Sequence, residues 1–276
     1  FHGSVSDGLL AALALAMVAW RERPPGGDPR PLIRLEGHGR EEHVVPGADL
    51  SRTVGWFTAI YPVGLDLSGI DLDDAFAGGP AMGAAVKAVK EQLLAVPDKG
   101  IGYGLLRYLN PETAQQLPDQ LPGQVSFNYL GQVLDAGQQG TGWLPASDLG
   151  SLPAGYDADM PVMAAIDVNA IVVGERLTAN FGYPTTLLDE DTVRSFADRW
   201  VAALTALAAH ARQPGAGGHT PSDFPLVSAT QADVNRWERD FPALAEVWPL
   251  SDLQTGLLFH AQLATELDVY VLSLIH

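Results

Sequence analysis

The residues best suited to chemistry lie in one short stretch, residues 35–42, with the sequence LEGHGREE. It holds three carboxylates, a histidine and an arginine, and it directly follows the short apolar run at residues 32–35. An apolar run that stops in Gly-x-Gly is typical of a strand that ends in a tight corner, because glycine permits close backbone approach and positive φ. Glu36 would then be held by a rigid strand end, which suits a general acid or base. The alternative is a solvated charged turn.

The elements that must position this stretch can be read from periodicity and turn residues. Apolar and aromatic runs bounded by Gly and Pro predict strands at residues 32–35, 56–63, 125–130, 162–173 and 176–183, the last two joined by a tight turn at 174–175. Helical periodicity predicts helices at 7–20, 82–96 and 189–212, with shorter ones near 102–109 and from Pro111. Residues 21–30 and 132–156 are predicted loops. Strands interleaved with helices predict a layered α/β fold with a mixed sheet and flanking helices.

Composition bounds the class of protein. The chain has 276 residues, 47% of them hydrophobic and 18% charged, which is typical of a globular domain with a sizeable core. Its net charge of −17 argues against nucleic acid and anionic membranes as partners. The sequence has no cysteine, which fits a reducing cytoplasm, and its seven histidines are scattered, so we expect no metal site.

Five motifs occur in a fixed order along the chain: VSDGLL at residues 5–10, EGHGRE at 36–41, DLSRTVGWFT with YPV at 49–63, KGIGYG at 99–104 and FNYLGQ at 127–132. In this order they closely resemble the motif series of the epimerization domains of nonribosomal peptide synthetases, a branch of the condensation-domain superfamily. The resemblance covers residues 1–212, and EGHGRE is nearly a signature of the epimerizing branch.

The resemblance implies a two-lobed fold like that of chloramphenicol acetyltransferase, of which residues 1–212 would be the C-terminal lobe. The N-terminal lobe would be missing. Residues 213–246 would be a linker with a short helix, and 247–276, which include a VWPLSDLQTGLLFH motif, the incomplete beginning of an adjacent condensation domain. The implied partner is a peptidyl carrier protein, whose 4′-phosphopantetheine arm presents the substrate. No cofactor would be bound directly.

The implied reaction inverts the Cα of an aminoacyl or peptidyl thioester from L to D, by removing a proton from one face and delivering one to the other. The resemblance assigns this work to a histidine of the N-terminal lobe and to Glu36. The histidine has no counterpart here, because the N-terminal lobe is missing. Residues 2–8 can be laid over the histidine motif of the superfamily, but Gly3 stands at the position of the catalytic histidine, so we interpret this segment as structural. We therefore expect the isolated fragment to be inactive. Partial desolvation, with Trp56, Phe57 and Tyr61 as an apolar wall, would raise the pKa of Glu36 towards neutrality.

The other candidate site residues each have a structural alternative. Arg40 matches the arginine of the motif, where it would orient a carboxylate or support the glycine corner, or form an ion pair with a nearby acidic residue. Asn128 is expected to contact substrate and Tyr129 to support it, or either could pack in the core; on a strand their side chains point to opposite faces. The resemblance implies an active site in a tunnel between the two lobes. Ser51 and Arg52 resemble the loop that forms the floor of this tunnel; alternatively, they serve as a helix cap and a surface charge. These assignments complete the expected substrate-binding set of Asn128, Tyr129, Ser51, Arg52 and Trp56.

Two other functions fit parts of the sequence. One is a condensation domain that forms peptide bonds, against which EGHGRE stands, since amide formation gives its glutamate no needed role. The other is a non-catalytic segment that docks carrier proteins. His38 is expected to shape the corner through a backbone hydrogen bond rather than to take part in the chemistry.

Overall fold

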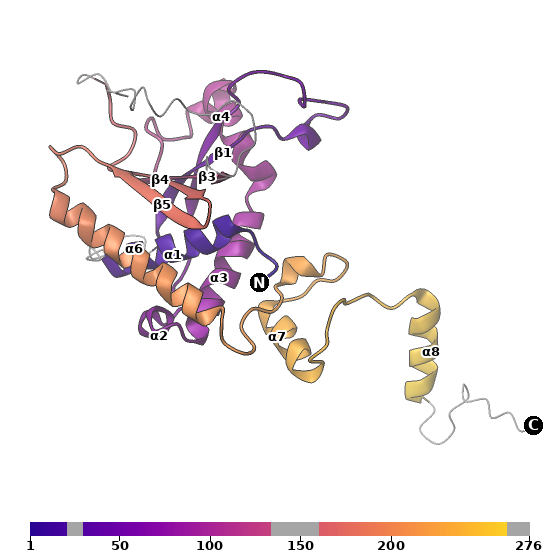
Figure 1. Cartoon of the computed structure of the whole chain (residues 1–276). Coiled ribbons are helices and arrows are strands. Elements are labelled where there is room, and N and C mark those ends of the chain that lie inside the picture. The colour runs from indigo at the N-terminus through magenta and orange to yellow at the C-terminus, as the bar shows by residue number, and fades with distance from the viewer. Residues whose placement is uncertain (21–29, 134–159, 264–276) are drawn as a thin grey trace, which may run out of the picture. The chain divides into compact units, whose positions relative to one another are not determined.

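The computed structural model describes residues 1–20, 30–133 and 160–263 (Figure 1). Most of the two predicted loops at 21–30 and 132–156, and residues 264–276 of the predicted following domain, lie outside the described residues. The chain divides into two compact units, one of residues 3–217 and one that begins at residue 218.

The first unit is built on a five-stranded sheet of order β2-β1-β3-β4-β5. β1 lies parallel to β3 and β3 parallel to β4, whereas β2 and β5 are antiparallel edge strands. The sheet is therefore mixed and flanked by helices, which confirms the predicted α/β fold class. The strands are β1 (Leu32–Gly37), β2 (Ala59–Gly64), β3 (Val125–Val133), β4 (Ile166–Val173) and β5 (Arg176–Gly182).

The helices of this unit are α1 (Val5–Trp20), α2 (Leu72–Phe76), α3 (Pro80–Leu94), α4 (Ile101–Tyr108), α5 (Pro111–Ala114) and α6 (Glu190–His210). Figure 1 shows α1 and α6 lying side by side next to the sheet. Within the described ranges, no helix combines the length and the apolar character that crossing a bilayer requires.

The core lies between the sheet and these helices. Nine consecutive residues of α1, from Leu9 to Met17, are buried, so this helix is enclosed on all sides as its alanine-rich sequence predicts. α6 begins at the cap Asp189, which accepts a hydrogen bond from the Thr192 amide, and packs Phe196 and Trp200 inward. The Trp200 indole donates to the Leu9 carbonyl oxygen at 3.2 Å, and this bond ties the two helices together.

The described residues of the second unit form two α-helices, α7 (Gln231–Asp240) and α8 (Asp252–Leu263). A capping box of Thr230 and Asp233 starts α7, the short helix predicted within residues 213–246. A reciprocal pair of hydrogen bonds between Ser251 and Gln254 precedes α8. The large apolar side chains of α8 are exposed: Leu253, Leu257, Leu258, Phe259 and Leu263.

Candidate active site

The two faces of the sheet differ in character. Side chains alternate along each strand, so the residues that face α1 and α6 are apolar, such as Ile33, Phe127 and Val168. Their neighbours in sequence point to the opposite face, and the strand register aligns these polar residues in rows. Arg34, Ser126 and Asp167 form one row. Further along the strands, Asn128, Asn169 and Asn180 form a second row. Glu36 lies at the β1 end of this row, because Glu36 and Asn128 directly follow Leu35 and Phe127, the last residues that pair β1 with β3.

Glu36 lies at the end of β1 on this polar face and is half-buried. Within the described parts of the chain, its carboxylate has neither a hydrogen bond nor an ion pair, while Ile60 of β2 lies opposite it in the register. Burial raises the pKa of Glu36, and the negative charge of Asp167 raises it further. A half-buried carboxylate that no protein group neutralises can accept or donate a proton more readily near neutral pH than an ordinary one.

Asn128 and Tyr129 lie on opposite faces of β3. Asn128 stands beside Glu36 in the polar row and is half-buried. Tyr129 packs against the hydrophobic core instead. Of this pair, only Asn128 shares a face with Glu36, so an amide and a carboxylate are adjacent there.

The corner after β1 is built by His38 and Gly39. The Arg40 amide donates to His38 Nδ1 at 2.9 Å, which is the backbone hydrogen bond that the sequence predicts for this histidine. In a neutral ring, the proton is then on Nε2. Gly39 has φ of +66°, and a Cβ atom there would lie 1.6 Å from the Phe57 carbonyl oxygen. Only glycine fits this position.

Arg40 connects the corner to the loop at residues 49–57. Its guanidinium donates to the carbonyl oxygens of Leu50, at 3.0 Å, and Gly55, at 3.5 Å. It also lies over the Phe57 ring, 4.5 Å from the ring centre. Of the roles considered for Arg40, support of the corner is therefore the one that these contacts favour, and its partners are backbone carbonyls rather than a carboxylate.

Ser51, Arg52 and Trp56 lie in this loop and are exposed, Trp56 by 91%. The Ser51 amide donates to Asp49 Oδ1 at 2.9 Å, so the loop makes a local turn. The strand predicted from residue 56 begins only at Ala59, since Arg40 and the close approach of Gly39 hold residues 55–57 out of the sheet. Trp56 therefore does not line an apolar wall around Glu36.

Glu41 follows the corner and is the centre of a charged cluster. Its side chain is 5% exposed, and its oxygens lie 3.4 Å from His38 Nε2, 3.5 Å from His43 Nδ1 and 3.3 Å from Lys99 Nζ. His43 also lies 3.4 Å from Asp98. Asp98 and Lys99 have positive φ, at 45° and 49°, so their backbone is strained for residues with side chains. Glu41 thus links the corner after β1 to the strained turn before α4.

Replacing Glu41 with alanine should lower the free energy of unfolding by about 1–3 kcal/mol, because one buried carboxylate lies against the side chains of two histidines and a lysine. Denaturant unfolding of the chain measures this change. Glu175→Ala, at the exposed turn between β4 and β5, is the matched control and should change stability by less than about 0.5 kcal/mol. Equal effects of the two substitutions would contradict a structural role for the Glu41 cluster.

Asp167 and Asn169 belong to the polar face but are absent from the residues predicted from sequence. Asn169 Nδ2 donates to Asp167 Oδ2 at 2.7 Å. Their signal was present in the sequence: in IDVNAIVV, residues 166–173, polar residues alternate with apolar ones at the first four positions. Such alternation predicts a strand with one polar face, and that face could have been matched to the one bearing Glu36.

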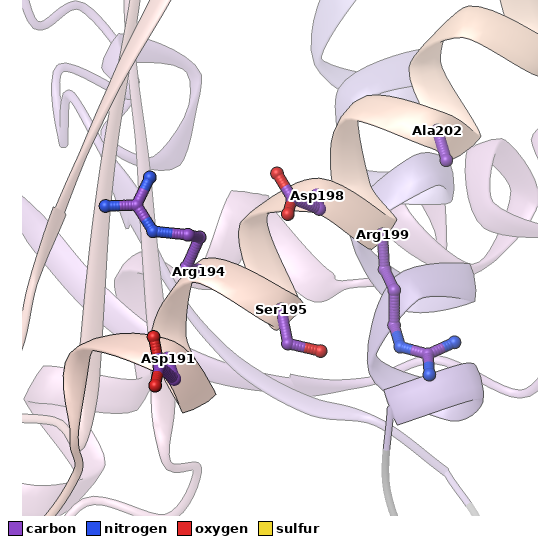
Figure 2. A pocket seen from close by; sticks show the side chains of 6 residues that line it. All are labelled: Asp191, Arg194, Ser195, Asp198, Arg199 and Ala202. Carbon is purple, nitrogen blue, oxygen red and sulfur yellow. The ribbon is translucent and has the colours of Figure 1, made fainter.

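Among the described residues, neither a group of metal ligands nor the pocket along α6 indicates a different candidate site. No three His, Asp or Glu side chains among them are grouped to hold a metal ion. An open depression of about 410 Å³ lies along α6 (Figure 2). Figure 2 shows that a single helix supplies its lining, so it is a helix surface and not the candidate site; the lining residues are Asp191, Arg194, Ser195, Asp198, Arg199 and Ala202.

Comparison with known proteins identifies the family. A family model described as the condensation domain matches residues 2–225. The chain belongs to the condensation-domain family of nonribosomal peptide synthetases. Among relatives of this condensation-type domain, a linear gramicidin synthase from Brevibacillus parabrevis is 38% identical over 98% of the chain. Chondramide synthase from Chondromyces crocatus is 40% identical over 98% of the chain. The domain spans only 3% and 6%, respectively, of the length of these proteins.

A solved structure also resembles this condensation-type domain. The epimerization domain from the third module of tyrocidine synthetase B aligns with a TM-score of 0.57 and 30% sequence identity. The alignment covers 76% of the present chain and 42% of that domain. The layered α/β unit with its mixed sheet is thus the fold of this superfamily.

Proposed function

We propose that this domain takes part in epimerizing the Cα of an aminoacyl or peptidyl thioester, converting L to D, within a nonribosomal peptide synthetase. The observation that carries the proposal is Glu36, a half-buried carboxylate without a protein partner among the described residues, next to the Asn128 amide on the polar face of the sheet. Two further facts support it. The EGHGRE motif surrounds Glu36, and an epimerization domain is among the structures that this chain resembles.

The chemistry requires two proton transfers at one carbon. A base removes the Cα proton, and the electron pair moves onto the thioester carbonyl to form an enolate. A proton delivered to the opposite face then gives the inverted thioester, so no atom is gained or lost. Glu36 serves one of these faces. The group for the other face is expected from the rest of an epimerization domain, of which this chain aligns with 42%.

Asn128 is proposed to contact the reacting thioester. An amide N–H beside Glu36 can donate to the enolate oxygen, where charge develops in the transition state. Arg40 is proposed to act as a positioning residue, because it fixes the corner that follows Glu36. Tyr129 would support the strand from the core side.

The exposed loop residues are proposed to meet the carrier or its arm. Ser51, Arg52 and Trp56 lie together in a loop that Arg40 attaches to the corner. The substrate would arrive on the 4′-phosphopantetheine arm of a peptidyl carrier protein, so none of these residues needs to hold a free cofactor. By the same proposal the isolated chain is inactive, since it supplies one proton-transfer group of two.

Two rival functions make different predictions in one experiment. The parent module, with its carrier loaded as an L-aminoacyl thioester, is incubated in D₂O, and the released amino acid is analysed for configuration and Cα deuterium. Epimerization gives the D isomer with deuterium at Cα. A condensation domain or a docking segment gives neither, and that result would refute the proposal.

Replacing Asn128 with alanine in the parent module should slow inversion by about 10²-fold, because one donor to the developing oxyanion is lost. The rate of D-isomer formation from the loaded carrier measures the effect. Asn180→Ala is the matched control, since Asn180 lies in the same row on the edge strand β5. An equal loss in both variants would indicate damage to the sheet instead of a lost contact.

A further inference from the structure

We infer that Asp167, held by Asn169, is a positioning residue that keeps a proton on the Glu36 carboxyl and makes Glu36 the proton donor of the reaction. The inference rests on the proposed function and adds to it the direction in which Glu36 transfers a proton. It also assigns a role to a strand, β4, that lies outside the motifs of the sequence.

The strand register puts the two carboxylates on the same face. β1, β3 and β4 run parallel, and Leu35, Phe127 and Val168 all point into the core. Glu36 and Asp167 therefore both point to the polar face, two strands apart and one row apart. Asn128 and Asn169 occupy the two positions that follow Glu36 in its row. A continuous set of polar side chains leads from one carboxylate to the other.

The Asp167 carboxylate is fixed by its neighbour. Asn169 Nδ2 donates to Asp167 Oδ2 at 2.7 Å, and both residues are half-buried. An amide N–H can only donate, so this bond sets the orientation of the Asp167 carboxyl group. The bond leaves the negative charge of Asp167 on the polar face.

No cation of the described residues on this face cancels that charge. Arg34 is the only basic residue of β1, and its guanidinium donates to the carbonyl oxygens of Leu121 and Pro122. Beyond the strand end, Glu41 engages the nearby cations. Near Glu36 and Asp167, the other described residues of the polar face are uncharged: Ile60 and Pro62 from β2, Ser126 and Asn128 from β3, Asn180 from β5, and the Tyr103 hydroxyl from α4 near Arg34. Arg176 of β5 lies on the same face, but it pairs with Val173, at the opposite end of β4 from Asp167.

Glu36 and Asp167 therefore have different environments and different roles. Burial raises the pKa of Glu36, and the charge of Asp167 adds to this. A carboxyl group whose pKa is raised in this way suits the role of a general acid. Glu36 then holds the proton that is delivered to the enolate carbon, and the Cα proton leaves to a base outside this chain.

The test replaces Asp167 with asparagine, which keeps the shape and removes the charge. In this chain, with ¹³C-labelled glutamate, the Glu36 carboxyl should titrate at lower pH in Asp167→Asn than in the native protein. Asp198→Asn, at the exposed surface of α6, is the control and should leave the titration unchanged. Asn169→Ala, a second variant with the charge retained, should move the titration in the same direction by less. A Glu36 titration that is unchanged in Asp167→Asn overturns the inference.

A second readout comes from the parent module. Inversion by Asp167→Asn should fall by less than about tenfold at neutral pH, because loss of a general acid itself costs about 10²–10⁴-fold. The limb of the pH–rate profile due to Glu36 should move to lower pH. The two proposals fail separately: an unchanged titration removes only the role of Asp167, whereas wild-type inversion by Glu36→Gln removes the epimerization proposal itself.

Discussion

Glu36→Gln in the parent module should lower the rate of D-isomer formation by about 10²–10⁴-fold, the usual contribution of a positioned acid or base. Glutamine keeps the size and the hydrogen-bonding capacity of the side chain but cannot exchange a proton. Because the Glu36 carboxylate makes no hydrogen bond or ion pair in the described residues, its replacement breaks no such interaction of the fold. The measurement is the rate of inversion of a carrier-bound L-aminoacyl thioester.

The stability of the Glu36→Gln variant is the control for folding. The direction in which the substitution changes stability follows from the raised pKa of Glu36. Burial and the Asp167 charge raise the pKa of Glu36, so the folded protein binds more protons than the unfolded chain between the two pKa values. Stability therefore falls as pH rises through that window, so the raised pKa of Glu36 lowers the stability of the fold at neutral pH. Glu36→Gln should then be at least as stable as the native chain at pH 7, with the gain lost in acid. A loss of stability at pH 7 would contradict this assignment. Glu175→Gln should change neither stability nor inversion.

Gly39→Ala should have the largest effect on stability, at more than about 3 kcal/mol. A left-handed backbone costs a residue with a side chain about 1–2 kcal/mol. The added Cβ would also meet the Phe57 carbonyl oxygen at 1.6 Å, a clash with backbone that only a movement of the corner can relieve. Since Arg40 and Glu41 follow directly, the movement would disturb both of their contact sets. Denaturant unfolding of the chain measures the loss.

Gly47→Ala separates the two parts of this cost. Gly47 has φ of +79°, but nothing lies within 4 Å of its added Cβ. It should lose only the backbone component, about 1–2 kcal/mol. Equal losses of stability in the two variants would show that the corner can move to relieve the clash at no energetic cost. Gly39 would then have no special role in presenting Glu36.

The elements were more predictable than the contacts between them. The hairpin turn at residues 174–175, the long helix predicted from residue 189 and the short helix within residues 213–246 depend on local signals, and the structure confirms each of them. The start of β2 was not predicted, because the contact of Arg40 with the Phe57 ring joins residues that no local pattern connects. Trp56 seemed suited to a buried strand for its β propensity, yet it lies in the loop that this contact holds.

Residues of the candidate site could be predicted where a local sequence pattern marks them. They could not be predicted where only the pairing of strands brings them to the site. Glu36 followed from a strand that ends in glycine, and Asn128 from alternation along β3. The alternation along β4 marks Asp167 as a residue of a polar face, but Asp167 joins Glu36 only through two parallel strand pairings, which local alternation does not specify. Glu41 was noticed only as an ion-pair partner for Arg40. Its actual partner Lys99 comes from a turn far along the chain.

The most direct measurement is the rate of D-isomer formation by the parent module carrying Glu36→Gln, with its carrier loaded and its fold verified. If Glu36 transfers a proton on one face of the substrate, inversion falls by about 10²-fold or more, while Glu175→Gln inverts at the native rate. Inversion by folded, loaded Glu36→Gln at the native rate would contradict the central claim.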